Sequence, residues 1–114
     1  MHAIGLDIGG TTLKLGIVRD GEEIVYRDVR PSVHEAAGLA RVAGEMIRRA
    51  WSVQPDAPAG ISCAGAFDAD GLWNANQLHL ERVPLPELLH TEIGREIPLE
   101  NDGVCALLAE MENG

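Results

Sequence analysis

The sequence is poor in aromatic residues. Phe, Trp and Tyr make up 4% of its 114 residues, whereas hydrophobic residues as a whole make up 46%. A chain of this length and hydrophobicity suits one compact domain, and intrinsic disorder is not expected. Because aromatic side chains are scarce, aliphatic side chains and alanine must form most of the core.

Basic residues are scarce relative to acidic ones. The chain has 9 Lys and Arg against 18 Asp and Glu, which gives a formal net charge of −9, and no segment concentrates the basic residues. This charge argues against nucleic acid or an anionic membrane surface as the main partner. An acidic protein can still bind phosphate groups where backbone N–H groups and Mg²⁺ supply the positive field.

Metal-binding and membrane-spanning patterns are missing. The two cysteines, Cys63 and Cys105, lack C-x-x-C spacing, and the four histidines lack H-x-x-x-H spacing. We therefore expect no zinc site within this chain, and we interpret both cysteines as small buried hydrophobic residues. No apolar run approaches membrane-spanning length, and Asp7 interrupts the early apolar run, so neither a membrane helix nor a signal peptide is expected. Cytoplasmic localisation is the default expectation.

The most informative segment, L-D-I-G-G-T-T-L, comes near the start of the chain. Gly9 and Gly10 allow a tight turn and a close approach of the backbone to a ligand. The hydroxyl groups of Thr11 and Thr12 add donors for a phosphate, and Asp7 is placed to hold a hydrated Mg²⁺ beside it. An ordinary hairpin with a glycine turn and a capping aspartate fits the same spacing equally well.

Hydrophobic periodicity predicts an α/β domain with the element order β-β-β-α-β-α-β-α. Asp20-Gly21 predicts a two-residue turn between the second and third strands. Ser32 and Glu35 form an S-x-x-E capping box, after which apolar residues recur at helical spacing up to Gln54. The predicted strands are residues 3–8, 12–18, 23–30, 59–64 and 97–100, and the predicted helices are residues 32–54, 84–93 and 104–111.

Two further segments carry polar residues. Residues 73–80 contain Asn74 and Asn76 and are interpreted as too polar for the core, with Trp73 alone as a packing residue. Asn101 and Asp102 follow the last predicted strand, at the carboxyl edge of the sheet where α/β folds bind ligands. On spacing alone, Asp102 is better suited to cap the following helix, and Asn101 suits either a turn or a hydroxyl-binding role.

Three motifs resemble those of the ROK family of bacterial sugar kinases and repressors. They are G-L-D-I-G-G-T from Gly5, G-I-S-C-A-G-A-F-D from Gly60 followed by Gly71 and Asn76, and E-N-D-G from Glu100. The family belongs to the superfamily of sugar kinases, Hsp70 and actin. The resemblance implies a ribonuclease-H-like (actin-like ATPase) lobe with a five-stranded mixed sheet.

The resemblance covers the chain from residue 4 to its end and implies that residues 1–114 are an N-terminal lobe. Family members continue into a second lobe, which is absent from this chain and is the expected partner of the first lobe. Where the family usually has proline on each side of Gly65, this sequence has Ala64 and Ala66, which is expected to loosen the loop. The chain begins at its first strand rather than at a helix-turn-helix, which favours a kinase over a repressor.

A glucokinase-like activity is implied, in which ATP with Mg²⁺ phosphorylates a hexose. The resemblance assigns Asp102 as the general base that takes the proton of the sugar's primary hydroxyl group. The implied sugar-binding residues are Asn101, Gly65 and Asn76. The residues implied to face the ATP phosphates are Gly9, Gly10, Thr11 and Thr12, with Asp7 holding Mg²⁺ through water.

Two other classes of function stay open, a non-catalytic sugar sensor and an ATPase that acts on a protein partner. Asp102 argues against the sensor, because a sensor needs no base, and the cysteine spacing argues against an ATPase that activates radical enzymes. The isolated chain is expected to have little or no kinase activity, because half a cleft cannot exclude water or clamp ATP. Apolar surface left exposed by the missing lobe favours self-association, and a homodimer is expected.

Overall fold

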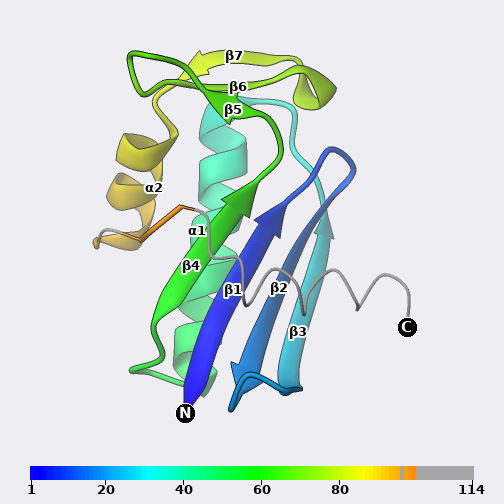
Figure 1. The fold of residues 1–114 in the computed structure, drawn as a ribbon, viewed down its shortest axis with the longest axis vertical. Helices are drawn as coiled ribbons and strands as arrows, with labels where there is room; N and C mark the ends of the chain where they lie inside the picture. The colour runs from blue at the N-terminus through cyan, green and yellow to red at the C-terminus, as the bar shows by residue number, and fades with distance from the viewer. Residues whose placement is uncertain (96, 100–114) are drawn as a thin grey trace.

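The computed structural model describes residues 1–95 and 97–99. Its larger sheet has four strands in the order β3-β2-β1-β4 (Figure 1). Their bounds are His2–Ile8 for β1, Thr12–Arg19 for β2, Glu23–Pro31 for β3 and Ala59–Cys63 for β4. The first three strands are antiparallel neighbours, and β4 pairs parallel with β1, as the sequence predicts.

A five-stranded sheet is not confirmed by the described residues. Residues 97–99 contribute one isolated parallel bridge, between Ile61 of β4 and Leu99. Glu100, Asn101, Asp102 and the predicted helix at residues 104–111 lie outside the described residues.

The hairpin between β2 and β3 turns where the sequence predicts it. The φ angles are +55° at Asp20 and +71° at Gly21, and the N–H group of Glu22 donates to the carbonyl oxygen of Arg19 at 3.1 Å. Positive φ at both central residues is typical of the tight turns that match the twist of two antiparallel strands.

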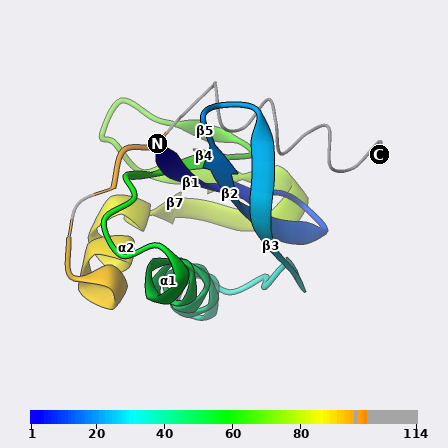
Figure 2. The same cartoon turned by 90° about the horizontal axis from the view of Figure 1, so that it is seen from below.

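Helix α1 (Ala36–Val53) covers one face of the larger sheet (Figure 2). It begins later than the capping box predicts, because Glu35 rather than Ser32 is the N-cap. The Glu35 carboxylate accepts a hydrogen bond from the N–H group of Gly38 at 2.7 Å. A carboxylate at this place satisfies one of the unpaired N–H groups of the first turn and complements the helix dipole.

The core lies between α1 and the larger sheet, and its composition confirms the expectation of an aliphatic core. Among the described residues, Trp73 is the one aromatic side chain in it. The central members, all with no exposed surface, are Ile4, Leu6, Ile8, Leu13, Leu15, Ile17, Leu39, Met46 and Ile47. Cys63 is half-buried and packs against this cluster.

A second, three-stranded sheet lies across the end of the larger sheet at which β1 and β4 terminate (Figure 1). Its elements, with the short 3-10 helix η1 between the last two strands, are β5 (Ala66–Phe67), β6 (Trp73–Ala75), η1 (Asn76–Leu78) and β7 (Leu80–Val83). Helix α2 (Leu85–Ile93) follows, packs beside α1 and ends at Gly94 with φ +84°.

The interpretation of residues 73–80 as too polar for the core is wrong. Trp73, Ala75 and Leu78 are buried, whereas Asn76 is exposed and Asn74 is half-buried. The indole N–H group of Trp73 donates to the carbonyl oxygen of Ala64 at 2.8 Å. This segment therefore anchors the small sheet on the core through its apolar residues.

Candidate functional site

Two loops meet at the carboxyl edge of the larger sheet. One is the glycine turn, defined here as residues 9–12 between β1 and β2. The other starts at Ala64, directly after β4. The N–H group of Ala64 donates to the carbonyl oxygen of Ile8 at 2.9 Å, which a proline at this position could not do. Alanine therefore adds a backbone bond between this loop and the end of β1, and the expected loosening of the loop stays a prediction.

The glycine turn closes on itself. The N–H group of Gly9 donates to the carbonyl oxygen of Thr12 at 3.0 Å, and a Cβ atom on Gly9 would lie 3.1 Å from that oxygen. Within the described residues, the N–H groups of Gly10 and Thr11 donate to no acceptor. The turn therefore offers backbone donors of the kind that bind phosphate oxygens.

Ser32 holds the glycine turn from the side of β3. Its hydroxyl group donates to the carbonyl oxygen of Gly9 at 2.6 Å, and its N–H group donates to the carbonyl oxygen of Thr11 at 3.0 Å. In a trans peptide the C=O and the next N–H point in opposite directions. The two bonds therefore direct the N–H groups of Gly10 and Thr12 away from Ser32.

Asp7 is half-buried near the end of β1. In the sheet it lies between Lys14 of β2 and Ser62 of β4, its register partners on either side. Burial raises the pKa of the Asp7 carboxyl, and the nearby positive charge of Lys14 lowers it by a smaller amount. A carboxylate that has lost part of its hydration gains from a nearby cation, so Asp7 suits a site next to a hydrated Mg²⁺.

Gly65 forms part of a pocket of about 450 Å³ beside the glycine turn. Its φ is +90°, and a Cβ atom here would lie 2.2 Å from the carbonyl oxygen of Asn74. Only glycine fits so close a contact between two backbone segments. The pocket is lined by Ala64, Gly65, Ala66, Asn74, Ala75, Asn76 and Gln77.

The structure thus brings the two predicted sugar-binding residues that it describes, Gly65 and Asn76, to one pocket. Asn76 lies at the start of η1 and is exposed. Its position allows its amide to face a ligand in the pocket, but no hydrogen bond within the described residues fixes that side chain. Its role as a sugar ligand stays a prediction.

An ionic and amide network braces the wall of this pocket. One carboxylate oxygen of Asp68 accepts bonds from the N–H groups of Asp70 and Leu72, and the other accepts from the Asn74 amide and Arg82. The side-chain oxygen of Asn74 in turn accepts from the N–H group of Arg82 at 3.0 Å. Hydrogen bonds to its carboxylate, first of all the one from Leu72, lower the pKa of Asp68.

Gln77 joins the pocket to the glycine turn, and the sequence analysis missed it. It lines the pocket, and a Cβ atom on Gly10 would lie 3.1 Å from both the Cβ and the Oε1 atoms of Gln77. Ser32 and Arg82 were also not predicted as site residues, because each bonds to residues more than ten positions away in the sequence. The register of β2 with β3 pairs Thr12 with Pro31, and this pairing alone would have placed Ser32 beside the turn.

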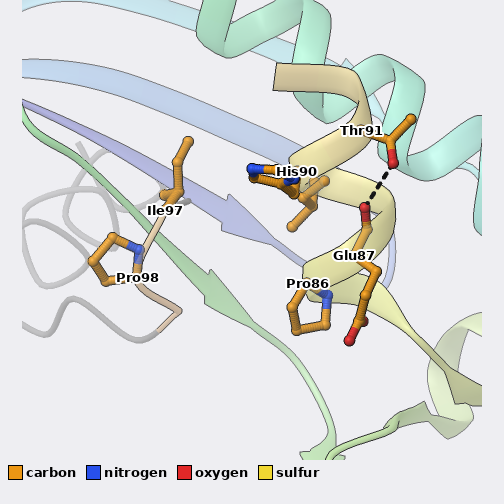
Figure 3. A pocket seen from close by; sticks show the side chains of 7 residues that line it. Pro86, Glu87, His90, Thr91, Ile97 and Pro98 are labelled. Atoms are coloured by element: carbon orange, nitrogen blue, oxygen red, sulfur yellow. Dashed lines mark hydrogen bonds between the residues drawn. The ribbon is translucent and has the colours of Figure 1, made fainter. Parts of the chain in front are cut away.

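A larger pocket, of about 650 Å³, lies between α2 and residues 97–98 (Figure 3). It shares no residue with the glycine turn or the Gly65 pocket, and its walls include Pro86, Leu89, Ile97 and Pro98. The hydroxyl group of Thr91 already donates to the carbonyl oxygen of Glu87 at 3.0 Å. Size alone therefore does not make this pocket the functional site.

The described residues form neither a cluster of metal-ligating side chains nor a membrane-spanning helix. No group of three or more His, Cys, Asp or Glu residues in residues 1–95 and 97–99 is arranged to hold a metal ion. No helix in the same part of the chain is long and apolar enough to cross a membrane. Asp7 stays the one predicted Mg²⁺ residue, and its role is not tested by these findings.

Residues 3–114 match the model of the ROK family. The chain belongs to the ROK family. It is 28% identical over 115 residues to a glucokinase of Thermotoga maritima, an alignment that covers 96% of this chain and 36% of the relative. It is 31% identical over 120 residues to a beta-glucoside kinase of Klebsiella pneumoniae, with 100% of this chain and 39% of the relative covered.

The fold agrees with this family membership. The chain superposes on the crystal structure of a ROK hexokinase from Thermus thermophilus with a TM-score of 0.72 and 29% identity, covering 98% of this chain and 39% of that one. The resemblance to the ROK family and the α/β class with a mixed sheet are confirmed. The chain spans between 36% and 39% of the length of these relatives.

Proposed function

We propose that the full-length protein transfers the γ-phosphoryl group of ATP to a hydroxyl group of a hexose. The observation that carries this proposal is the contact between the glycine turn and the Gly65 pocket through Gln77. Phosphoryl transfer requires the donor and the acceptor to be held side by side. In a chain whose relatives are sugar kinases, the turn suits the phosphates and the pocket suits the sugar.

The chemistry follows from this division. The N–H groups of the glycine turn would hold phosphate oxygens. Asp7 would hold Mg²⁺ through water, and the ion would supply positive charge against the phosphates. Asn76, Asn101 and the backbone at Gly65 orient the sugar. Asp102 takes the proton of the attacking sugar hydroxyl group. The hydroxyl oxygen bonds to the γ-phosphorus as the bond from that phosphorus to ADP breaks, and ADP leaves. A well-placed base contributes roughly 10²–10⁴-fold to the rate.

The partners of the lobe are part of the proposal. The remaining length of the protein supplies the second wall of the cleft, so residues 1–114 alone have little or no kinase activity. We further propose that the enzyme acts in the cytoplasm, where ATP is available, and that it forms a homodimer. The exposed Val25 and Val29 on the edge strand β3 give apolar surface for association.

The test is transfer of the terminal phosphate from labelled ATP to a panel that includes glucose, N-acetylglucosamine and mannose. We expect a sugar phosphate from at least one of them with the full-length protein, and none above background with residues 1–114. Tight sugar binding without any transfer would replace the kinase by a non-catalytic sugar sensor. ATP hydrolysis that ignores every sugar would favour an ATPase with another partner. Light scattering of the full-length protein tests the dimer.

A further inference from the structure

We propose that Gln77 is a sugar-contacting residue, which binds the acceptor on the side nearest the glycine turn. This inference rests on the proposed function and adds a residue to it. None of the three sequence motifs that resemble the ROK family assigns Gln77 a role.

The backbone at Gln77 is held in place. Its neighbours Ala75 and Leu78 are buried with 1% and 0% of their surface exposed, so η1 is anchored on the core on both sides of Gln77. The side chain of Gln77 itself is exposed. An anchored backbone with an exposed side chain is the usual design of a binding residue, because the functional group returns to the same place without being used in packing.

Gln77 borders both halves of the proposed site. It lines the pocket that contains Gly65 and Asn76. The atoms nearest to a Cβ on Gly10 all belong to Gln77, with its Cβ and Oε1 at 3.1 Å. A sugar in the pocket must present its reacting hydroxyl toward the phosphates at the turn. That hydroxyl group, or the one next to it on the sugar ring, then lies beside the Gln77 carboxamide.

The chemistry of the carboxamide suits a sugar. It has two N–H donors and an acceptor oxygen, so it can serve a hydroxyl group in either role. In the part of the chain that the structure describes, the Gln77 side chain makes no hydrogen bond, so its donors and acceptor are available to a ligand. It carries no charge and therefore does not repel a phosphoryl group that crosses from the turn.

The test compares steady-state kinetics of the full-length protein with those of Gln77→Ala and Gln77→Leu, using the best hexose of the panel. Glu81→Ala is the control, because Glu81 is also exposed in the small sheet but lines neither the pocket nor the turn. We expect both Gln77 variants to raise the KM for the sugar about 3- to 10-fold, the loss of one hydrogen bond to a neutral group. The KM for ATP should change less than about 2-fold, which is less than the loss of one hydrogen bond would cause.

The outcomes separate this inference from the proposed function. If the KM for the sugar in the Gln77 variants equals that of Glu81→Ala, the inference is overturned, but the proposed kinase function stands. A wild-type protein that binds sugar without transferring phosphate would overturn the proposed function, and calorimetry of sugar binding to Gln77→Ala would then test the contact directly. A rise in the KM for ATP as large as that for the sugar would assign Gln77 to the turn, against the inference. Thermal unfolding of each variant checks that the fold is retained.

Discussion

Gly65→Ala tests whether the pocket requires two backbone segments in direct contact. Two separate costs follow from the structure. The φ of +90° at Gly65 is unfavourable for alanine by about 1–2 kcal/mol, the cost of a left-handed backbone. The added Cβ would also lie 2.2 Å from the carbonyl oxygen of Asn74 and 3.0 Å from the Cα atom of Ala75. Relieving such an overlap costs about 1–3 kcal/mol.

The overlap is hard to relieve because Asn74 is held on several sides. Its side chain bonds to Asp68, to the carbonyl oxygen of Leu72 and to the N–H group of Arg82. We therefore expect Gly65→Ala to lower the free energy of unfolding by about 2–5 kcal/mol, the sum of the two costs. Urea denaturation followed by tryptophan fluorescence measures this change, because Trp73 is buried next to the loop and donates to Ala64.

Gly71→Ala is the matched control. Its φ is +79°, close to that of Gly65, but no atom lies within 4 Å of an added Cβ. Gly71→Ala carries the backbone cost without the overlap, so the difference between the two variants isolates the contact with Asn74. If Gly65→Ala is no less stable than Gly71→Ala, the close contact is wrong and the pocket has another shape.

Three further predictions follow from single contacts in the site. Ser32→Ala should raise the KM for ATP about 3- to 10-fold, because the bond to the Gly9 carbonyl oxygen is lost, and should leave the KM for the sugar unchanged. Ser32→Thr, which keeps the hydroxyl group, should restore the KM for ATP, and equal effects on the two KM values would contradict the prediction. Asp7→Asn should raise the Mg²⁺ concentration needed for half-maximal turnover, because the ion loses a carboxylate. The same change should raise stability at neutral pH, because the folded state raises the pKa of Asp7 and so disfavours its charge. That gain should be absent at pH values below the ordinary Asp pKa and develop as pH rises through the raised pKa; denaturation at a series of pH values would show a constant difference if burial were not the cause. Trp73→Phe should lower the free energy of unfolding by about 1–3 kcal/mol, since the Ala64 carbonyl loses its donor, and an unchanged urea midpoint would argue against that bond.

Local signals predicted those parts of the fold that depend on neighbours in the sequence. The turn at Asp20-Gly21 and the helix end at Gly94 both follow from residues that accept positive φ, and both are found in the structure. The glycine turn and the two strands that flank it, β1 and β2, were likewise predictable, because each requires only a few adjacent residues. The placement of the candidate phosphate site at the end of β1 therefore needed no tertiary information.

Contacts between distant residues were not predictable in this way. The S-x-x-E pattern at Ser32 and Glu35 predicted the wrong cap, because the Ser32 hydroxyl bonds to Gly9, which is 23 residues away in the sequence. The burial of Trp73 was predicted, but that of Ala75 and Leu78 was not, because it depends on the core beneath the small sheet rather than on their polar neighbours in the sequence. Gln77 has no local signal at all, since its significance comes from facing Gly10.

Comparing wild-type full-length protein with Asp102→Asn in ATP-dependent phosphorylation of a hexose tests the central claim most directly. The account predicts measurable transfer in the wild type and a loss of roughly 10²–10⁴-fold in kcat for Asp102→Asn, with the sugar still bound. Asparagine can still cap the helix that the sequence predicts at residues 104–111, so a purely structural role for Asp102 would leave turnover nearly unchanged. That result, or a wild type that transfers no phosphate to any sugar, would contradict the account.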